Sequence, residues 1–367
     1  MKAIAVRQGR NEPEQIEVDT PEVTPNRVLV RTIALGICGT DRDILASGEP
    51  RTPPNESYLI LGHEAVGQIE VVGEGVQGLD PGDFIVPSVR RPRDGAPKPY
   101  RLDLAAWDEF TERGIYYQHG FSAAYWSESP DHLYCVPAGL EPFAMLTEPF
   151  SVSEKAFNEA IQIQHARIGE NGFRHRNPRV LVTGLGPIGF TAALISRAHG
   201  FDTTIVGRRA EKDYQVQFGY ALGIDYLDSR QVDFKDFQGR NRNFDLIIEC
   251  TGNDQLTYAV TNALGDRGIM VITGAERHGW EPITVDFSYL MHRLLMYNQI
   301  LIGTVNAATP RDFQAAFEHM HWIQCHYPNA LSNLITLRVP FEAFRDAYAP
   351  RRPDSIKTII EYSSVER

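Results

Sequence analysis

The chain has 367 residues, of which 43% are hydrophobic and 23% are charged, and its formal net charge is −11 at pH 7. Because a typical domain holds roughly 100–200 residues, this length predicts two or three domains. The acidic excess opposes binding to phosphate backbones and to anionic lipid heads. It therefore favours a small-molecule ligand over nucleic acid or a membrane.

The N-terminus, the apolar runs and the spacing of the cysteines bear on where the protein resides. The first seven residues lack the apolar core of a signal peptide, and the longest mostly apolar run, 181–195, is shorter than the roughly 20 residues that cross a bilayer. Both observations predict a cytoplasmic protein without a transmembrane segment. The cysteines form no C-x-x-C pair, which argues against a disulfide framework and against a four-cysteine zinc site; they are Cys38, Cys135, Cys250 and Cys325.

The first 150 residues contain short β-rich runs, such as 27–32 and 66–72, interrupted by glycine and proline. This pattern predicts an irregular, mostly β domain. Residues 90–100 hold three prolines, one glycine and no apolar periodicity, so they are predicted to form an exposed, solvated loop.

Beyond residue 151 the pattern changes to alternating helices and strands. A helix is predicted at 153–164, strands at 179–183, 203–206, 244–249 and 269–273, and helices between them, including one at 255–264. This alternation indicates an α/β fold with a doubly wound parallel sheet. The tail from about 307 contains predicted helices at 313–321 and 341–348 and a strand at 357–362, and it could pack back onto the first domain.

A dinucleotide fingerprint follows the strand at 179–183. The segment Gly184-Leu185-Gly186-Pro187-Ile188-Gly189 is a G-x-G-x-x-G that opens a helix, where glycines let the backbone approach a pyrophosphate at the helix N-terminus. With a second strand at 203–206, the motif predicts a cofactor site rather than a simple glycine-rich turn.

The cofactor predicted from the next strand end is NADP. An acid that binds the ribose of NAD is usual there, but this chain has Gly207-Arg208-Arg209. Two guanidiniums suit a 2′-phosphate, so NADP is preferred and NAD remains possible; alternatively the arginines are solvated surface residues. Two further strand ends are expected beside the nicotinamide half, namely Thr251-Gly252 and Thr273-Gly274-Ala275.

A candidate metal site precedes this region. His63 and Glu64 are adjacent in Gly62-His63-Glu64-Ala65-Val66-Gly67, and Cys38 opens Cys38-Gly39-Thr40-Asp41 about 25 residues upstream. A thiolate, an imidazole and one or two carboxylates can hold Zn²⁺ with an open position for catalysis. Taken singly, each of these residues could equally be structural.

Together these motifs resemble the zinc-dependent medium-chain alcohol dehydrogenase family over nearly the whole chain. Several segments further resemble its archaeal-type glucose 1-dehydrogenases, among them 61–65, 86–91, 147–150, 207–209 and 303–306. The resemblance implies a GroES-like catalytic domain at 1–152 and 307–367, a Rossmann NADP-binding domain at 153–306, and a homotetramer.

The resemblance also implies roles for individual residues. Cys38 and His63 match the zinc ligands, and Glu64 and Glu148 lie close to the metal. Positions that hold sugar hydroxyls in the family match Thr40, Glu112, Glu148 and Asn306. Thr304, Val305 and Asn306 are expected at the cofactor. Relatives with a structural zinc carry cysteines near 88–112, where this chain has none, so only one zinc is expected.

The predicted reaction is oxidation of an aldose, glucose above all, at C1 to the 1,5-lactone with hydride transfer to NADP⁺. Cys38, Thr40, His63 and Glu64 form the predicted catalytic set, in which Thr40 relays a proton. The main alternative is a zinc alcohol or polyol dehydrogenase acting on another sugar or alditol. A non-catalytic NADPH-binding protein is a weaker alternative, because the metal-ligand residues are all present.

Overall fold

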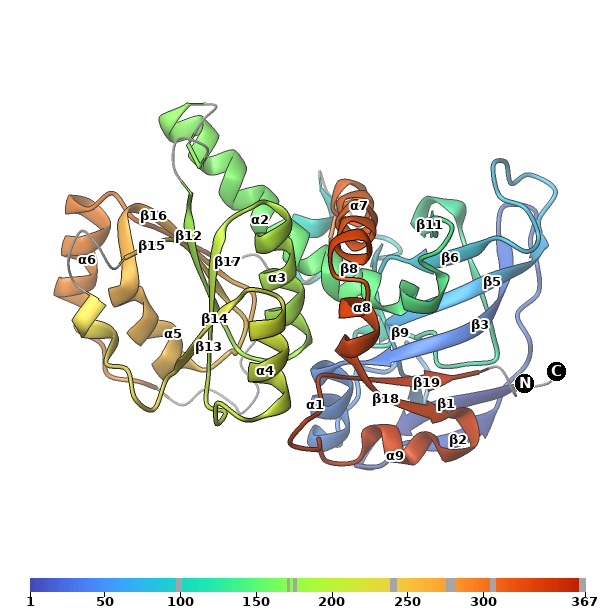
Figure 1. Ribbon diagram of the computed structural model, residues 1–367. Coiled ribbons are helices and arrows are strands. Elements are labelled where there is room, and N and C mark those ends of the chain that lie inside the picture. Colours follow the sequence, from blue (N-terminus) through green and yellow to red (C-terminus); the bar gives the residue numbers. More distant parts are fainter. Residues whose placement is uncertain are drawn as a thin grey trace. The chain divides into compact units, whose positions relative to one another are not determined.

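The computed structural model describes residues 1–96, 101–169, 172–173, 177–237, 243–274, 282–303 and 308–362 (Figure 1). The chain divides into two compact units. The first contains Met1–Glu148, Ala307–Met320 and Leu331–Arg367, and the second contains Pro149–Asn306 and His321–Ala330. The domain boundaries expected from the sequence, after residues 152 and 306, stay predictions.

The first unit is mainly β, and its largest sheet is built around β3 (Val28–Ile37). Its strand order is β11-β6-β5-β3-β19-β18, with β10 also pairing with β3. The other strands of this sheet are β5 (Glu64–Val72), β6 (Phe84–Pro87), β10 (Tyr125–Glu128), β11 (Leu133–Cys135), β18 (Ile335–Pro340) and β19 (Lys357–Glu361). Because β19 comes from the C-terminal tail and pairs directly with β3, the tail completes this sheet.

Two smaller sheets and the helices of the tail complete the first unit. One sheet has the order β2-β1-β4, with β1 (Lys2–Arg7), β2 (Glu14–Glu17) and β4 (Tyr58–Ile60); the other has the order β7-β8-β9, with β7 (Arg90–Pro92), β8 (Phe110–Arg113) and β9 (Tyr117–Gln118). The helices are α1 (Gly39–Ser47), α7 (Pro310–His326), α8 (Ala330–Leu334) and α9 (Phe344–Tyr348), of which α7 and α8 extend into the second unit.

Apolar residues from distant parts of the chain form the core of the first unit. Val30 and Leu35 of β3 pack with Phe341 and Ile360 of the tail, and all four are buried. Val30 and Leu35 are five residues apart and still join the same core, because the pairing of β3 with β5 shifts register between Thr32 and Ala34. The core therefore fixes the tail against β3 by hydrophobic burial as well as by backbone pairing.

The second unit contains one parallel sheet with the order β14-β13-β12-β15-β16-β17. Its strands are β12 (Arg179–Thr183), β13 (Asp202–Gly207), β14 (Asp225–Asp228), β15 (Phe244–Glu249), β16 (Leu264–Ile272) and β17 (Ile300–Gly303). The order reverses between β12 and β15, which is the topological switch point of a doubly wound fold. The predicted α/β class with a Rossmann-type sheet is confirmed.

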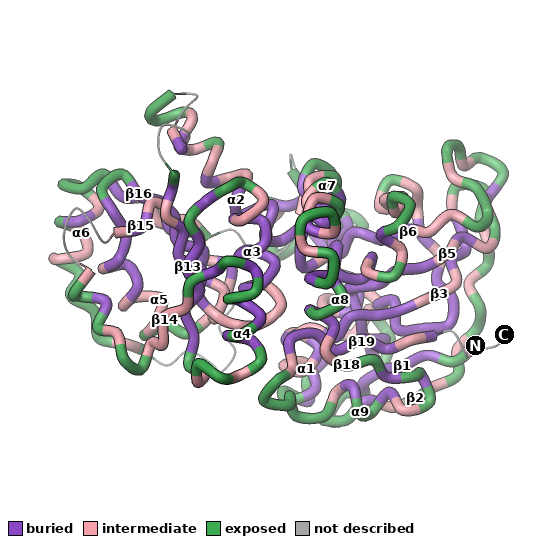
Figure 2. Tube along the Cα trace, viewed as in Figure 1, coloured by how far each residue is buried: buried purple, intermediate pink, exposed green. Residues whose placement is uncertain are grey.

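Helices cover the sheet of the second unit. Its helices are α2 (Thr147–Ile168), α3 (Pro187–Ala198), α4 (Tyr214–Ala221), α5 (Asp254–Val260) and α6 (Phe287–Met296). Helix α3 packs on β12 and β13, whereas Val260 of α5 packs with Leu181, Ile247 and Met270 of the sheet (Figure 1). The central strands β12, β13 and β15 are mostly buried, as Figure 2 shows for β13 and β15, because a parallel sheet needs cover on both faces, whereas the edge strands β14 and β17 are partly exposed.

One prediction about local structure is wrong. Residues 90–92 form strand β7, and Arg90 and Arg91 are buried instead of solvated. Proline and glycine downstream in the segment suggested a loop, but the pairing of β7 with β8 and two buried ion pairs decide the conformation of its first residues. Residues 97–100 lie outside the described part of the chain.

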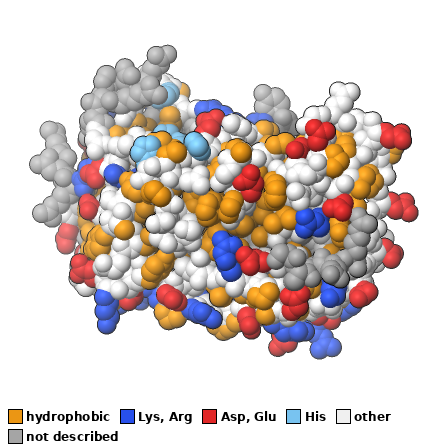
Figure 3. Space-filling model, turned by 45° about the vertical axis from the view of Figure 1, so that its right-hand side comes forward, with side chains coloured by type: hydrophobic (Ala, Val, Ile, Leu, Met, Phe, Trp, Pro, Cys, Tyr) orange, Lys and Arg blue, Asp and Glu red, His pale blue; other side chains and the backbone are white. Residues whose placement is uncertain are grey.

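Two observations concern the surface of the molecule. No helix in the described ranges is long and apolar enough to cross a membrane. On the face drawn in Figure 3, acidic and basic side chains of the described residues are interspersed among uncharged and hydrophobic ones. The cytoplasmic location expected from the sequence stays a prediction.

Candidate metal centre and cofactor site

The N-terminus of α1 places the first candidate ligand. Cys38 is the N-cap of this helix, and its backbone N–H donates to Asp41 Oδ2 at 2.8 Å, which closes a capping box. Such a box satisfies backbone groups that a helix end leaves unpaired. The capping bond therefore fixes the backbone that carries Cys38. Thr40 lies in the same turn, with its Oγ1 3.7 Å from Cys38 Sγ.

His63 is held by the same aspartate. Its Nδ1 lies 3.5 Å from Asp41 Oδ1, and both side chains are almost fully buried. Burial alone would lower the pKa of His63, but the Asp41 carboxylate raises it well above its usual value. The surroundings thus favour positive charge at this position. Since Nδ1 faces Asp41, Nε2 is the nitrogen that remains to bind a metal.

Glu64 is placed by strand pairing. In the antiparallel registers Glu64 of β5 lies opposite Gly36 of β3, and Gly36 lies opposite Ile359 of β19 on the other side. Lys357, at the start of β19, makes a buried ion pair with Glu64 Oε2. A Cβ at Gly36 would collide with that oxygen and would lie 2.9 Å from Lys357 Cε. The glycine therefore leaves the space that this ion pair occupies.

Cys38, His63 and Glu64 each offer one ligand atom, and these atoms all lie within 4.8 Å of one another. A thiolate, an imidazole and a carboxylate are zinc ligands, and three protein ligands leave a position for substrate. A divalent cation also supplies the positive charge that the Asp41 carboxylate favours at His63. The three predicted residues therefore fit zinc. We call Cys38, His63, Glu64, Asp41 and Lys357 the metal cluster.

Glu148, the fourth predicted ligand, lies near this group without belonging to the three whose ligand atoms are within 4.8 Å. Burial and then the charge of Glu64 raise the pKa of Glu148 to about 7, and Glu112 adds to the rise. Glu148 is thus close enough to the metal cluster to be affected by its charges, and Glu112 is close to Glu148. Their assignment to metal or sugar stays a prediction.

Arg90 binds only one of the two carboxylate oxygens of Glu112. Arg90 Nε and Nη2 donate to the same oxygen, Oε1, at 3.1 and 2.9 Å. The guanidinium of Arg90 also lies 3.7 Å from the centroid of the Phe110 ring. Among the described residues no hydrogen bond reaches Glu112 Oε2. One oxygen is therefore fixed while the other can accept a hydroxyl.

A second set of buried charges surrounds Glu128. Arg91 Nη2 lies 2.6 Å and Arg113 Nε 3.7 Å from Glu128 Oε2. Burial alone would raise the pKa of Glu128, but these two guanidiniums lower it to about 2. With the pair Arg90–Glu112 they form what we call the arginine cluster. Arg90, Arg91 and Glu112 of this cluster lie in segment 88–112, where relatives with a structural zinc carry cysteines and this chain has none.

The glycine loop of the second unit has the geometry that the fingerprint predicts. Gly184 adopts φ +94°, and its N–H donates to Val206 O at 2.7 Å, which joins the loop to β13. A Cβ at Gly189 would collide with Gly184 O. Gly186 is the N-cap of α3 and Pro187 its first residue, with Ile188 and Gly189 in the first turn. The helix N-terminus is therefore available to a pyrophosphate.

Sequence reasoning missed Glu249, which organises the other strand ends. Its buried carboxylate accepts hydrogen bonds from Thr183 Oγ1 at 3.1 Å and from the N–H groups of Thr251 and Gly252 at 2.7 and 3.3 Å. Its backbone carbonyl accepts from Thr273 Oγ1 at 2.7 Å. A Cβ at Gly274 would lie 2.7 Å from Glu249 Oε2. The Glu249 carboxylate thus fixes the ends of β12 and β15, and the backbone carbonyl of the same residue fixes the turn after β16.

The remaining predicted residues divide into two groups. Gly207 ends β13, and Arg208 and Arg209 follow it, with Arg208 exposed and Arg209 half-buried. Ala275, Thr304, Val305 and Asn306 lie outside the described residues. The roles assigned to all of them stay predictions.

Two residues of the metal cluster were also without an assigned role in the sequence. Asp41 stands three residues after Cys38, which is the spacing of a capping box and was the available signal. Lys357 had no local signal, because its partner Glu64 is 293 positions away in sequence and only the pairing of β3 with both β5 and β19 brings them together.

Comparisons with known proteins agree with this geometry. The family of alcohol dehydrogenase GroES-like domains matches residues 24–135, and the family described as the glucose dehydrogenase C-terminus matches residues 141–362. Glucose 1-dehydrogenase 1 of Caldivirga maquilingensis is 33% identical over 363 residues, which cover 98% of this chain and 99% of that protein.

Solved structures give the same result. Haloferax mediterranei glucose dehydrogenase, in complex with NADP, zinc and gluconolactone, is 29% identical with a TM-score of 0.89, and the match covers 100% of both chains. The 2R,3R-butanediol dehydrogenase of Bacillus subtilis, 19% identical with a TM-score of 0.80 over 99% of both chains, shares the fold. The chain therefore belongs to the zinc-dependent medium-chain alcohol dehydrogenase family, and within it to the glucose dehydrogenases.

Proposed function

We propose that this protein is a glucose 1-dehydrogenase that oxidises D-glucose at C1 to D-glucono-1,5-lactone and transfers hydride to NADP⁺. The observation that carries the proposal is that the ligand atoms of Cys38, His63 and Glu64 converge, with the buried Glu148 near enough for the charge of Glu64 to raise its pKa. Zinc and NADP are its cofactors, as in the Haloferax complex. Zinc, when bound, supplies a Lewis acid that stabilises negative charge developing on the C1 oxygen.

The chain's own residues orient the groups around that chemistry. Asp41 fixes the ring of His63 through Nδ1, and Lys357 fixes Glu64 through Oε2. Such partners hold ligands in position and tune their charge. We assign the passage of the C1 proton outward to the Thr40 hydroxyl, which lies beside Cys38.

Recognition of a sugar needs hydrogen-bonding groups fixed before the substrate binds. Glu112 meets this need, because Arg90 holds one of its oxygens and leaves Oε2 to accept a sugar hydroxyl. An apolar alcohol would leave such groups unpaired, at a cost of about 1–3 kcal/mol each. We therefore expect Thr40, Glu112, Glu148 and Asn306 to select an aldopyranose over simple alcohols.

NADP binding is assigned to the glycine loop and to the residues after β13. The N-terminus of α3 would receive the pyrophosphate, and Arg208 and Arg209 would bind the 2′-phosphate through charge-assisted hydrogen bonds. Replacing both arginines should therefore raise the KM for NADP⁺ far more than the KM for NAD⁺. Equal changes would show that they do not contact the 2′-phosphate.

A homo-oligomer, by resemblance a tetramer, is the proposed assembly. In the second unit, Phe287, Leu295 and Met296 of α6 expose 64%, 68% and 64% of their surface, and β17 is an edge strand. Large exposed apolar side chains in one helix are typical of a protein–protein interface. Light scattering on the purified protein measures the assembly, and a monomer at micromolar concentration contradicts it.

Substrate and metal can be tested together. The purified protein is assayed with NADP⁺ and a panel of aldoses, alditols and simple alcohols, and glucose should give the highest kcat/KM. A higher value for an alditol would select the polyol dehydrogenase alternative, and a higher value for ethanol or benzyl alcohol would reject the sugar assignment. Elemental analysis should find one zinc per chain. Full activity after zinc has been removed by chelation would contradict the mechanism.

A further inference from the structure

Tyr226 makes an unusual pair of contacts at the proposed 2′-phosphate site. It lies on β14, next to β13, whose end carries Gly207. The Arg209 N–H donates to Tyr226 Oη at 2.9 Å, and the Tyr226 hydroxyl donates to the carbonyl of Arg209 at 2.8 Å. One phenol thus uses its donor and an acceptor on both backbone groups of one arginine.

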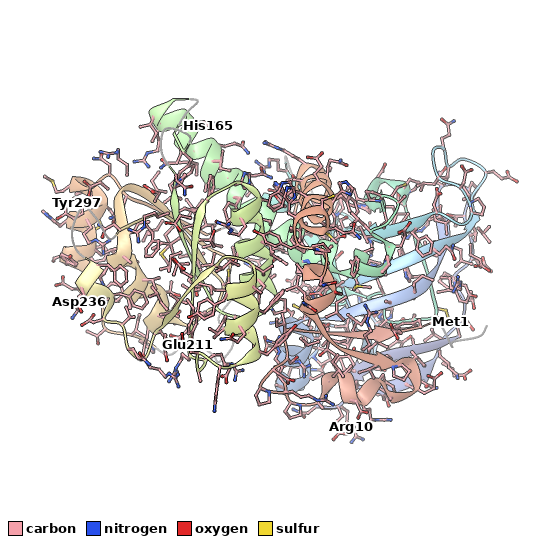
Figure 4. All side chains as sticks on the ribbon, viewed as in Figure 1. Met1, Arg10, His165, Glu211, Asp236 and Tyr297 are labelled. Carbon is pink, nitrogen blue, oxygen red and sulfur yellow. The ribbon has the colours of Figure 1, made fainter. Side chains whose placement is uncertain are left out.

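The same ring packs beside the preceding glycine. A Cβ at Gly207 would overlap Leu185 Cδ1 and would lie 3.6 Å from Tyr226 Cε2. The backbone between β13 and Arg209 is therefore confined by the glycine loop on one side and by Tyr226 on the other. The turn continues to Asp213, whose carboxylate accepts the Ala210 N–H at 3.0 Å. Glu211, which belongs to this turn, is labelled in Figure 4.

The one carboxylate at the end of β14, Asp228, is paired with an arginine, so its charge is neutralised near the proposed phosphate site. Asp228 stands at the end of β14, where a free carboxylate would repel a phosphate. Arg230 pairs with it through a fork, with Nη2 at 2.6 Å from Oδ2 and Nε at 2.9 Å from Oδ1. Arg230 Nη2 also donates to Arg209 O at 3.3 Å. The hydrogen bonds from Arg230 lower the pKa of Asp228 to about 2.

We propose that Tyr226 is a positioning residue that fixes the Arg208–Arg209 turn for the 2′-phosphate of NADP, and so sets the cofactor preference. The inference rests on the proposed assignment of the two arginines. A turn whose backbone is already fixed loses less conformational entropy when the arginines close on a phosphate, so binding is tighter. The adenosine and pyrophosphate contacts do not depend on this turn.

Tyr226→Phe tests the inference because it keeps the ring that packs near Gly207 and removes both hydrogen bonds. Binding of 2′,5′-ADP and of 5′-AMP to the full chain is measured by calorimetry, and neither probe requires catalysis. Since a hydrogen bond contributes a net 0.5–1.5 kcal/mol, the Kd for 2′,5′-ADP should rise about three- to tenfold. The Kd for 5′-AMP should change by less than about twofold, which is the spread expected when no contact is lost.

A matched control is available on the helix that follows the turn. Tyr220, on α4, is exposed, and its hydroxyl donates to Glu211 Oε1 at 3.4 Å. Tyr220→Phe removes a phenol close in sequence without touching Arg209, so both dissociation constants should stay at the wild-type values. Thermal unfolding of both variants shows whether the fold is kept.

Three outcomes would overturn the inference. An unchanged Kd for 2′,5′-ADP in Tyr226→Phe would show that the turn needs no such support. Equal weakening of both probes would show a general effect on the nucleotide site. A wild-type protein that binds 2′,5′-ADP no better than 5′-AMP would reject the arginine assignment itself along with the inference, whereas the first two outcomes leave that assignment standing.

Discussion

The first unit contains two buried clusters of charged side chains with opposite composition. In the metal cluster, Asp41, Glu64 and the Cys38 sulfur outnumber the one fixed cation, Lys357. In the arginine cluster, Arg90 pairs with Glu112, and Arg91 and Arg113 both pair with Glu128. Burial of charge is expensive unless it is paired. In the metal cluster a bound cation or a proton on His63 is needed to balance the acidic groups, whereas each guanidinium of the arginine cluster lies within ion-pair distance of a carboxylate.

This difference distinguishes buried charges that serve a binding site from buried charges that stabilise the fold. A buried donor set that lacks positive charge predicts a bound metal, and a buried set that closes on itself predicts a scaffold. Glu112 connects the arginine cluster to Glu148, because Arg90 holds its Oε1 while its charge contributes to the raised pKa of Glu148. The arginine cluster thus fixes one residue of the proposed sugar site.

The largest effect should follow from breaking the metal cluster at Cys38. Cys38→Ser replaces the thiolate ligand by a weaker one, so zinc content should fall and kcat/KM should drop by about 10³ or more, because the metal supplies several kcal/mol of transition-state stabilisation. Metal analysis and circular dichroism on the same sample separate this from unfolding. Cys135→Ser, at an exposed cysteine in the same unit, should leave both zinc and activity unchanged. Wild-type activity in Cys38→Ser would remove this residue from the mechanism.

Lys357→Met should make the stability of the fold depend on the metal. Without zinc, Glu64 would be buried with no counter-charge, which costs about 3–5 kcal/mol. With zinc bound, the loss should be smaller because the metal also neutralises Glu64. Denaturant unfolding of metal-free and zinc-loaded protein measures the difference, with Lys2→Met, at an exposed residue of β1, as the control. An equal loss in both states would contradict the charge argument.

Breaking the arginine cluster at Glu128 should affect stability and leave chemistry nearly intact. Glu128→Gln leaves Arg91 and Arg113 buried without their carboxylate, so the free energy of unfolding should fall by about 3 kcal/mol. Because the folded-state pKa of about 2 lies below the ordinary value of 4.5, this stabilisation is full above pH 4.5 and is lost as the pH falls towards 2. Unfolding at pH 7 and at pH 3 should therefore show a smaller difference between variant and wild type at pH 3. A kcat lowered tenfold would instead place Glu128 in the catalytic machinery.

The smallest effect on activity is expected at Glu112, and it should concern the sugar and not the cofactor. Glu112→Ala removes a sugar hydroxyl acceptor and should lower kcat/KM for glucose about tenfold, which corresponds to about 1.4 kcal/mol. Asn306→Ala should lower kcat/KM for glucose to a similar extent. The affinity for NADP⁺, measured by fluorescence titration, should stay within about twofold, since no cofactor contact of Glu112 is lost. A comparable loss of NADP⁺ binding would show a general disturbance of the fold rather than a sugar contact.

The amino-acid sequence determined the features that depend on neighbouring residues. The glycine fingerprint, the alternation of strands and helices after residue 151, and the pairing of a His-Glu dipeptide with an upstream cysteine are local patterns, and each predicted its element or site. Even the capping role of Asp41 is encoded in the three residues that separate it from Cys38.

Tertiary structure alone decided the contacts between distant positions. The ion pair between Lys357 and Glu64, the burial of Arg90 and Arg91 where a loop was predicted, and the bond from Tyr226 to Arg209 all depend on which strands become neighbours. Strand order is set by the packing of the whole core, and a lysine or arginine looks the same in sequence whether it is solvated or paired. The physical reason is that burial creates the need for a partner, and burial is a property of the folded chain.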